Sequence, residues 1–335
     1  MTEGIAKFVE HHLKDIARSH DTYLEDTPDF LRAMDKINNL EGDEILASID
    51  VKALYTNIPK EGGLKSLEAA LGTKENKAFI LQLMELILDN NLFSFHEAIY
   101  RQEIGGAMGS NAIPHYANTF MARQIDPQIK LIATQSTGVL KLLKRFLDDL
   151  FLIFKGTTRE LHMLLEMINQ IHPTIKFTMT HTSRENENLE DTCSCSTLKQ
   201  IPFLDTLCSI ENNKIEIGLY KKETDKNQYL LLNSCHPQAV TKNIPFSLSL
   251  RIVRICTSYE NRMKNLNQLK LLLKERNYPD HVIDPAVSRA LKISRSEALK
   301  KVNKSEKEKR PVFAVTYDPR LPSISGIVNK HQGPW

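Results

Sequence analysis

Two adjacent carboxylates are unusual in this chain because large apolar residues stand on both sides of them. Asp148 and Asp149 lie in the run Lys144-Arg-Phe-Leu-Asp-Asp-Leu-Phe-Leu-Ile-Phe154, which has the pattern of a buried β-hairpin with an acidic tip. An unpaired buried charge is costly, so these carboxylates should be paired, exposed at a turn, or neutralised by a cation. A magnesium site at the tip satisfies all three conditions.

A third carboxylate, Asp50, ends a second apolar run. The segment Ile45-Leu-Ala-Ser-Ile-Asp50 is short enough for a strand, and Pro59 stops regular pairing further on. A buried strand would deliver Asp50 to the edge of a sheet. Oxygen ligands from separate strands are what two-metal phosphoryl transfer needs, with the two ions roughly 3.5 to 4 Å apart.

Further motifs follow in order along the chain. The first, Asp50-Val-Lys-Ala-Leu-Tyr55, precedes the glycine-rich stretch Gly105-Gly-Ala-Met-Gly109-Ser110 and then Phe146-Leu-Asp148-Asp149. Further stretches are Ile201-Pro-Phe-Leu-Asp205, Leu219-Tyr-Lys-Lys-Glu-Thr-Asp, Ser234-Cys-His-Pro237 and Ile244-Pro-Phe-Ser-Leu. Together they resemble the reverse transcriptases of Penelope-like retroelements, relatives of telomerase, over nearly the whole chain. The first three stretches are similar to polymerase motifs A, B and C.

The resemblance implies a role for each residue of the acidic site. Asp50 and Asp148 would ligate two Mg²⁺ ions, for which Mn²⁺ could substitute, with Asp149 beside them and the Val51 carbonyl completing a shell. Tyr55 would lie under the incoming sugar and exclude a 2′-hydroxyl. The implied partners are an RNA template, a DNA primer or RNA–DNA hybrid, and deoxynucleoside triphosphates.

Other residues would contact the nucleic acid. Gly109 and Ser110 would face the template–primer junction, although the stretch is also compatible with an ordinary turn before a core helix. Lys176 is a candidate proton donor to pyrophosphate. The residues expected to track the duplex backbone are Arg251, Arg254, Arg262 and Lys264.

Charge is distributed unevenly. The whole chain has a net charge of +3, whereas residues 214–310 contain 21 Lys and Arg against 10 Asp and Glu, a local net of +11. A basic groove neutralises phosphates and gives affinity that depends on salt. A solvated basic face is the alternative reading of the same pattern.

Apolar periodicity predicts an α+β fold with an antiparallel sheet, helices on one face and a helical region after it. The resemblance implies that these parts are a polymerase palm and a thumb. The predicted helices are 5–17, 30–37, 64–71, 79–88, 112–125, 160–171 and 280–293. The predicted strands, besides those of the acidic hairpin and the Asp50 run, are 92–95, 99–104, 175–179, 203–210 and 215–220. Residues 180–200 are polar and predict an exposed excursion.

The thumb region has a helical stripe that runs through 245–276, composed of Leu248, Ile252, Ile255, Tyr259, Met263 and Leu266. Asn277-Tyr-Pro279 should break the helix, and Asp280 could cap the next one. Two helices with basic flanks are also typical of a DNA-binding helix-turn-helix.

These patterns predict four segments. Residues 1–40 form a helical lead-in left over from the fingers, 41–220 the palm, 221–295 the thumb, and 296–335 a basic linker and connector. Compared with the resembled family, we expect this chain to lack the N-terminal fingers segment and the C-terminal GIY-YIG endonuclease. Two hypotheses follow: an RNA-directed DNA polymerase, inactive or active as this shorter chain, or a non-catalytic nucleic-acid-binding remnant with a helix-turn-helix-like thumb.

Composition limits the classes of protein that are compatible with this interpretation. No apolar run approaches the ~18 residues of a membrane span, and the start lacks a secretory leader, so we expect an intracellular, nuclear protein without membrane contact. Five cysteines do not indicate a disulfide framework. Cys193, Cys195, Cys208 and His181 could supply a zinc site or be plain thiols and a histidine, and their spacing fits no standard zinc pattern.

Overall fold

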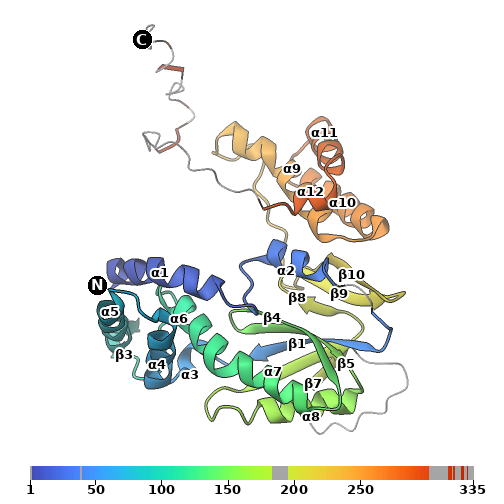
Figure 1. Ribbon diagram of the computed structural model, residues 1–335. Helices are drawn as coiled ribbons and strands as arrows, with labels where there is room; N and C mark the ends of the chain where they lie inside the picture. Colours follow the sequence, from blue (N-terminus) through green and yellow to red (C-terminus); the bar gives the residue numbers. More distant parts are fainter. Residues whose placement is uncertain are drawn as a thin grey trace. The chain divides into compact units, whose positions relative to one another are not determined.

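A five-stranded sheet organises the first part of the chain in the computed structural model, which describes residues 2–37, 40–182, 195–301 and a few residues beyond them. The strand order is β4-β5-β1-β6-β7 (Figure 1). Neighbouring strands are antiparallel except the parallel pair β6 and β7. The bounds are β1 Glu44–Val51, β4 Val139–Phe146, β5 Asp149–Lys155, β6 Phe177–Thr182 and β7 Cys195–Leu198.

The sheet is buried on both faces because strand β5 is apolar at successive positions. Leu150, Leu152 and Phe154 belong to the main core, which also contains residues of the helices. The intervening Phe151 packs with its ring centroid 4.9 Å from that of Phe30 and 5.2 Å from that of Phe203. An unbroken apolar run is what a strand covered on both sides requires.

Helices and small sheets surround this core. The helices are α1 Glu3–Arg18, α2 Thr27–Met34, α3 Leu54–Asn57, α4 Lys60–Leu71, α5 Lys77–Asp89, α6 Ile113–Phe120, π-helix η1 Met121–Ile125, α7 Asp126–Gln135 and α8 Thr158–Ile168. Helix α8 begins with a capping box, in which the Thr157 side chain accepts from the Glu160 amide and Glu160 accepts from the Thr157 amide. The remaining strands are β2 Leu92–Phe95, β3 Ala98–Arg101, β8 Ile201–Phe203, β9 Thr206–Glu211 and β10 Lys214–Leu219.

The chain divides into two compact units, Met1–Glu216 and Ile217–Trp335. The second unit contains helices α9 Gln238–Ile255, α10 Tyr259–Lys274, α11 Asp280–Leu291 and α12 Arg295–Ala298. Its core includes Ile252, Leu266, Leu269, Leu273 and Ile283. The four segments predicted from the sequence stay predictions at their boundaries, and most of 296–335 lies outside the described residues.

The predicted fold class is confirmed: antiparallel strands and helices form a mixed α and β fold. Three details differ. The strand expected at 203–210 is two strands, β8 and β9, because Leu204 adopts a left-handed φ of +54° at the turn between them. The helix expected at 112–125 continues through η1 and α7 to Gln135. The stretch expected to be an exposed excursion, 180–200, is exposed at residues 196–199, but its described residues include strand β7 and the end of β6.

The prediction of one helical stripe through 245–276 is wrong, because two helices, α9 and α10, divide this segment. Helix α9 begins at Gln238, not at Pro245, and ends at Ile255. Helix α10 then starts afresh because the Ser258 side chain accepts from the Asn261 amide at its N-cap. Tyr259, placed on the apolar stripe, is therefore 69% exposed. No described helix is long and apolar enough to cross a membrane.

Candidate active site

The register between β1 and β5 brings the three acidic residues together. Asp50 is the direct partner of Asp149 across the two strands. Phe146 pairs with Asp149, which leaves Leu147 and Asp148 as the turn of the β4–β5 hairpin. The Val51 amide donates to the Asp148 carbonyl at 3.1 Å, so the turn lies against the end of β1. Residues nearly 100 positions apart in the sequence thus meet at one end of the sheet.

Negative charge accumulates at this end of the sheet. Partial burial, and then the charge of Asp148, raise the pKa of the Asp50 carboxyl above its ordinary value. Within the described residues, no group of three or more His, Cys, Asp or Glu side chains has the arrangement of a metal site. Within the acidic cluster formed by Asp50, Asp148 and Asp149, the charges of Asp50 and Asp148 repel each other, and a cation would relieve that repulsion.

Tyr55 lies beside this cluster. It belongs to the short helix α3, which follows β1 after Ala53 takes a left-handed φ of +49°. Burial raises the pKa of the Tyr55 phenol, and the nearby charge of Asp148 adds to the effect. The half-buried ring is thus within electrostatic reach of Asp148, as the predicted sugar-contacting role requires.

The glycine-rich loop contacts Tyr55 through backbone atoms. The Gly106 amide donates to the Tyr55 carbonyl at 2.7 Å. A Cβ at Gly105 would lie 2.3 Å from the same oxygen, and Gly105 has φ +73°. Glycine is therefore required here for close approach to the protein's own α3 segment. Gly109, which the sequence singled out, is exposed with open space at its Cβ position, and its predicted role stays a prediction.

Ser110 begins the approach to helix α6. Its Oγ is buried and makes no hydrogen bond within the part of the chain that the structure describes. Pro114 lies in the first turn of α6, as expected, where a missing amide costs little. The predicted role of Ser110 at the template–primer junction stays a prediction.

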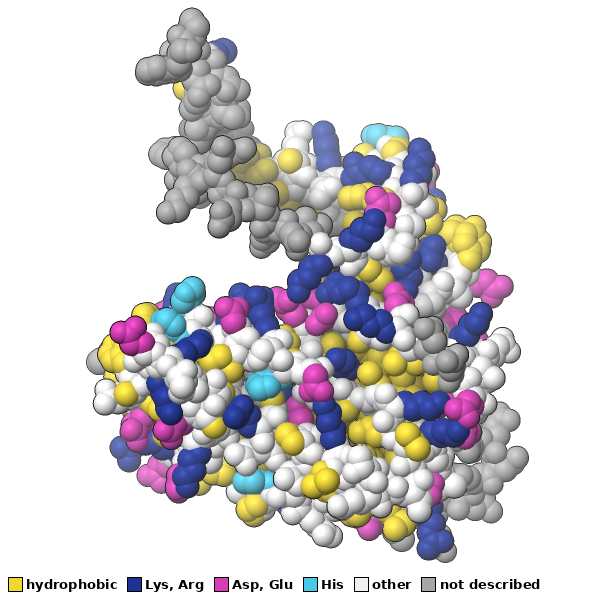
Figure 2. Space-filling view, in the orientation of Figure 1, with side chains coloured by type: hydrophobic (Ala, Val, Ile, Leu, Met, Phe, Trp, Pro, Cys, Tyr) yellow, Lys and Arg dark blue, Asp and Glu magenta, His cyan; other side chains and the backbone are white. Residues whose placement is uncertain are grey.

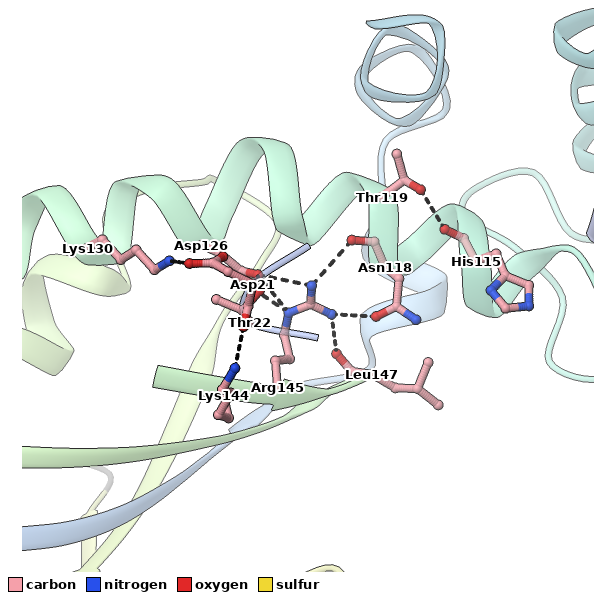
Figure 3. A network of polar contacts seen from close by, with 10 residues as sticks. All are labelled: Asp21, Thr22, His115, Asn118, Thr119, Asp126, Lys130, Lys144, Arg145 and Leu147. Carbon is pink, nitrogen blue, oxygen red and sulfur yellow. Dashed lines mark hydrogen bonds and ion pairs between the residues drawn. The ribbon is translucent and has the colours of Figure 1, made fainter. Parts of the chain in front are cut away.

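A buried arginine, Arg145, is the main residue that sequence reasoning missed (Figure 3). It lies on β4 with no exposed surface and forms an ion pair with Asp126 of α7 at 3.0 Å. It also donates to the side chain and carbonyl of Asn118 and to the carbonyl of Leu147 in the acidic turn. The Thr22 hydroxyl donates to Asp126 at 2.5 Å. An arginine inside an apolar strand, three residues before Asp148, was the available signal.

Lys176 does not point its amine at the acidic cluster. Its Nζ donates to the carbonyl of Asn169 at 2.7 Å and to that of His172 at 3.2 Å, so it binds the C-terminal end of α8 and the residues that follow. Positive charge at a helix C-terminus is a stabilising arrangement. The proposed proton-donor role is not supported by this geometry.

The residues considered for a zinc site have different surroundings in the structure. His181 is buried, and its Nε2 lies 2.9 Å from Nε2 of His162. Burial raises the pKa of the Cys208 thiol to about 12, which keeps it protonated at neutral pH. Cys193 lies outside the described residues.

The predicted nucleic-acid residues of the second unit fall into two pairs. Arg251 and Lys264 are exposed. Arg254 instead donates to the Ala298 carbonyl at 3.0 Å, and Arg262 to the Cys256 carbonyl at 3.2 Å. Figure 2 shows Lys and Arg side chains distributed over the visible face of this unit. Arg251 and Lys264 are therefore accessible to solvent. Arg254 and Arg262 also stabilise the helical unit through their hydrogen bonds to backbone carbonyls.

Comparisons with known proteins concern the second unit and the fold of the chain. An animal helix-turn-helix domain family matches residues 228–288, which include all of α9 and α10 and most of α11. Telomerase from Candida albicans, in complex with the TWJ fragment of telomeric RNA, has a similar structure with a TM-score of 0.56 and 12% identity. The match covers 87% of this chain and 48% of that one, so the chain spans about half the length of the telomerase.

Weaker structural matches have TM-scores below 0.5. Telomerase from Candida tropicalis, also in complex with a TWJ fragment, has a TM-score of 0.49 at 11% identity, covering 90% of this chain and 51% of that one. The RNA-dependent RNA polymerase of BmCPV at its elongation state has 0.46 at 11% identity, covering 84% and 24%. No curated protein sequence matches the chain. The fold is therefore of the kind found in telomerase, a polymerase-like fold.

We expect Gly105→Ala to destabilise the protein more than Gly109→Ala. Both glycines have positive φ, so both substitutions cost about 1 kcal/mol of backbone strain. Only the Gly105 variant also forces a Cβ against the Tyr55 carbonyl, which should add about 1 to 3 kcal/mol. Urea unfolding of the two variants and the parent measures the difference, and equal losses would contradict the close approach.

Asp50→Asn should stabilise the protein at neutral pH. Because the folded-state pKa of Asp50 is raised, its contribution to stability is present below its unfolded value of 3.8 and is lost as the pH rises through the raised value. The Asp50→Asn variant does not lose stability in this way. Its free energy of unfolding should therefore exceed that of the parent near pH 7 and equal it towards pH 3. Denaturant unfolding at several pH values measures it.

Glu61→Gln is the matched control with the opposite sign. A hydrogen bond from Lys65, and then the charge of Lys65, lower the pKa of Glu61. The stability from this exposed pair is present above the ordinary pKa and is lost as the pH falls, so its removal should slightly destabilise the protein near pH 7. A destabilised Asp50→Asn variant at neutral pH would contradict the charge repulsion at the acidic cluster.

Proposed function

We propose that this chain is the palm and thumb of an RNA-directed DNA polymerase of a Penelope-like retroelement. The observation that carries the proposal is the meeting of Asp50, Asp148 and Asp149 at one end of the sheet, with Tyr55 beside Asp148. A telomerase has the same kind of fold, and fold similarity at 12% identity supports the architecture alone. The chemistry is inferred from the residues.

The acidic residues fit a magnesium site of the kind that substrate completes. Mg²⁺ is usually held by one or two carboxylates together with substrate phosphates and waters rather than by a full cage of side chains. Asp50 and Asp148 would supply these carboxylates, with Asp149 and the Val51 carbonyl beside them. Burial, and then the charge of Asp148, raise the pKa of Asp50, and a cation bound between the two carboxylates would relieve the second of these effects. When bound, two magnesium ions would activate the primer 3′-hydroxyl and stabilise the leaving pyrophosphate.

The other residues of the site would position substrates. The Tyr55 ring would lie under the deoxyribose and exclude a 2′-hydroxyl by its bulk. Gly109 and Ser110 would border the template–primer junction. In the second unit, exposed Arg251 and Lys264 would bind backbone phosphates directly, and Arg254 and Arg262 would contribute positive charge while they hold helix ends.

A second candidate function rests on the helix-turn-helix match. Residues 228–288 match an animal helix-turn-helix family, and the positive charge of 214–310 suits nucleic acid. In this alternative, the chain binds nucleic acid and performs no polymerisation. The two candidates share the binding surface and differ only in what the acidic cluster does.

Primer extension distinguishes the two candidates. With an RNA template, a DNA primer, deoxynucleotides and Mg²⁺, the parent chain should extend the primer. A variant with Asp148→Asn and Asp149→Asn should lose this activity by about 10³-fold or more, because both carboxylates belong to the acidic cluster. Template–primer affinity, measured at several salt concentrations, should be the same for both forms.

Two other results would decide against the polymerase. No extension by the parent, with salt-dependent binding equal in both forms, would leave the helix-turn-helix alternative. Extension that survives both substitutions would assign the activity to other residues. A variant with Arg251→Gln and Lys264→Gln serves as a binding control, and we expect it to lower the salt dependence of affinity while its acidic cluster stays intact.

Tyr55→Ala should relax sugar selection. Loss of the ring opens space beneath the sugar, so incorporation of ribonucleotides relative to deoxynucleotides should rise about 10-fold or more. Competitive incorporation assays give this ratio for each variant. Tyr100→Ala, on the exposed β3 strand, is the matched control and should keep the parent ratio. An unchanged ratio for Tyr55→Ala would remove Tyr55 from the sugar site.

A further inference from the structure

The turn that carries Asp148 is conformationally unusual. Leu147 precedes Asp148 and has a φ of +55°, a left-handed conformation that is unfavourable for any residue with a Cβ. A turn of this kind persists only where the surrounding structure holds it. The position of the Asp148 carboxylate therefore depends on whatever fixes the two carbonyls of the turn.

Two elements hold these two carbonyls. The Val51 amide of β1 donates to the Asp148 carbonyl at 3.1 Å. Arg145 Nη1 donates to the Leu147 carbonyl, also at 3.1 Å. Since Arg145 is on β4, within the same hairpin, its guanidinium reaches past Phe146, the last residue of β4, to hold the Leu147 carbonyl. The turn is thus fastened on one side by a strand and on the other by a buried side chain.

The guanidinium is itself fixed by the elements around it. Nε donates to both Asp126 oxygens at 3.1 Å, and Nη2 donates to Asp126 Oδ2 at 3.0 Å and to the Asn118 carbonyl at 3.3 Å. Nη1 donates to Asn118 Oδ1 at 2.7 Å in addition to Leu147. A guanidinium has five N–H groups, and these contacts provide an acceptor for each. Lysine, with three donors and no planar fork, could not reproduce the set.

Fold stability alone does not require this arrangement. A buried ion pair can often be replaced by apolar residues of similar volume without loss of stability, because desolvation of the two charges offsets their attraction. What an apolar pair cannot do is donate to the Leu147 carbonyl. The same guanidinium also joins the acidic turn to Asn118 on α6, the helix that follows the glycine-rich loop (Figure 3).

We propose that Arg145 is a positioning residue for the proposed polymerase site, on which this inference rests. It holds the Leu147 carbonyl and thereby sets where Asp148 presents its carboxylate. Through Asn118 and Asp126 it makes that position depend on α6 and α7. Arg145 touches no substrate in this role and acts only through the turn.

The test uses variants of the full chain. Arg145→Met combined with Asp126→Leu replaces the ion pair by apolar side chains and removes the donor to Leu147, and Arg145→Lys keeps the charge without the fork. Thr22→Val is the matched control, because it removes the Thr22 bond to Asp126 and leaves all five guanidinium N–H groups in place. Thermal unfolding of each variant establishes that it is folded.

Two measurements on the folded variants report the turn and the metal separately. Amide exchange of Val51, whose N–H is bound to the Asp148 carbonyl, should accelerate about tenfold in the double variant and stay at the parent rate in Thr22→Val. Affinity for Mn²⁺, measured from the signal of the free ion, should fall about 10- to 100-fold in the double variant and in Arg145→Lys. Asp148→Asn gives the value for a site without its carboxylate.

The outcomes are distinguishable. Faster Val51 exchange together with weaker Mn²⁺ binding supports the positioning role. A folded double variant with parental exchange and parental Mn²⁺ affinity overturns it. In a third outcome, Val51 exchanges faster in the double variant, but the parent and Asp148→Asn bind Mn²⁺ equally. This result would support the role of Arg145 in holding the turn and would overturn the proposed metal-dependent function.

Discussion

The pairing register of β1 against β5 is the constraint on which the candidate site depends. Side chains alternate across a strand, so a shift of one residue would send Asp50 to the opposite face from Asp149. The register is held by apolar residues on both faces of the sheet, since Leu152 and Phe154 enter one core while Phe151 packs against Phe30 and Phe203. The position of the acidic cluster is therefore fixed by the packing of apolar residues.

Much of this site was readable from the sequence, for a physical reason. Carboxylates beside apolar strands are costly to bury, so Asp50 was expected where its strand ends and Asp148 and Asp149 at the tip of a hairpin, and the three residues meet at one end of the sheet. Helices with strong apolar periodicity, such as α1 and α8, were also predictable within a few residues. These features depend on local patterns of burial, which a single sequence displays directly.

Other features depend on contacts that no local pattern displays. Arg145 reads as one more charge beside an apolar run, and only the fold reveals that Asp126 and Asn118 surround it. Gly105 rather than Gly109 makes the closest backbone approach, because its neighbour is α3, which lies far away in sequence. In the second unit, the apolar stripe predicted from the sequence runs past the point where α9 ends and Ser258 caps α10. The spacing of apolar side chains does not indicate where one helix ends and the next begins.

The π-helix η1 has a consequence for the spacing between motifs. Asn118 and Asp126 are eight positions apart, and in a regular α-helix they would point about 80° away from each other. The wider turn at Met121–Ile125 reduces that angle, which lets both side chains reach one guanidinium. The segment thus accommodates one residue more than an ordinary α-helix would place between the two side chains. Seven residues of α-helix turn through about 700°, so removal of one residue together with a return to an ordinary α-helix would keep Asn118 and Asp126 on the same side, whereas removal of two would rotate α7 out of phase with α6.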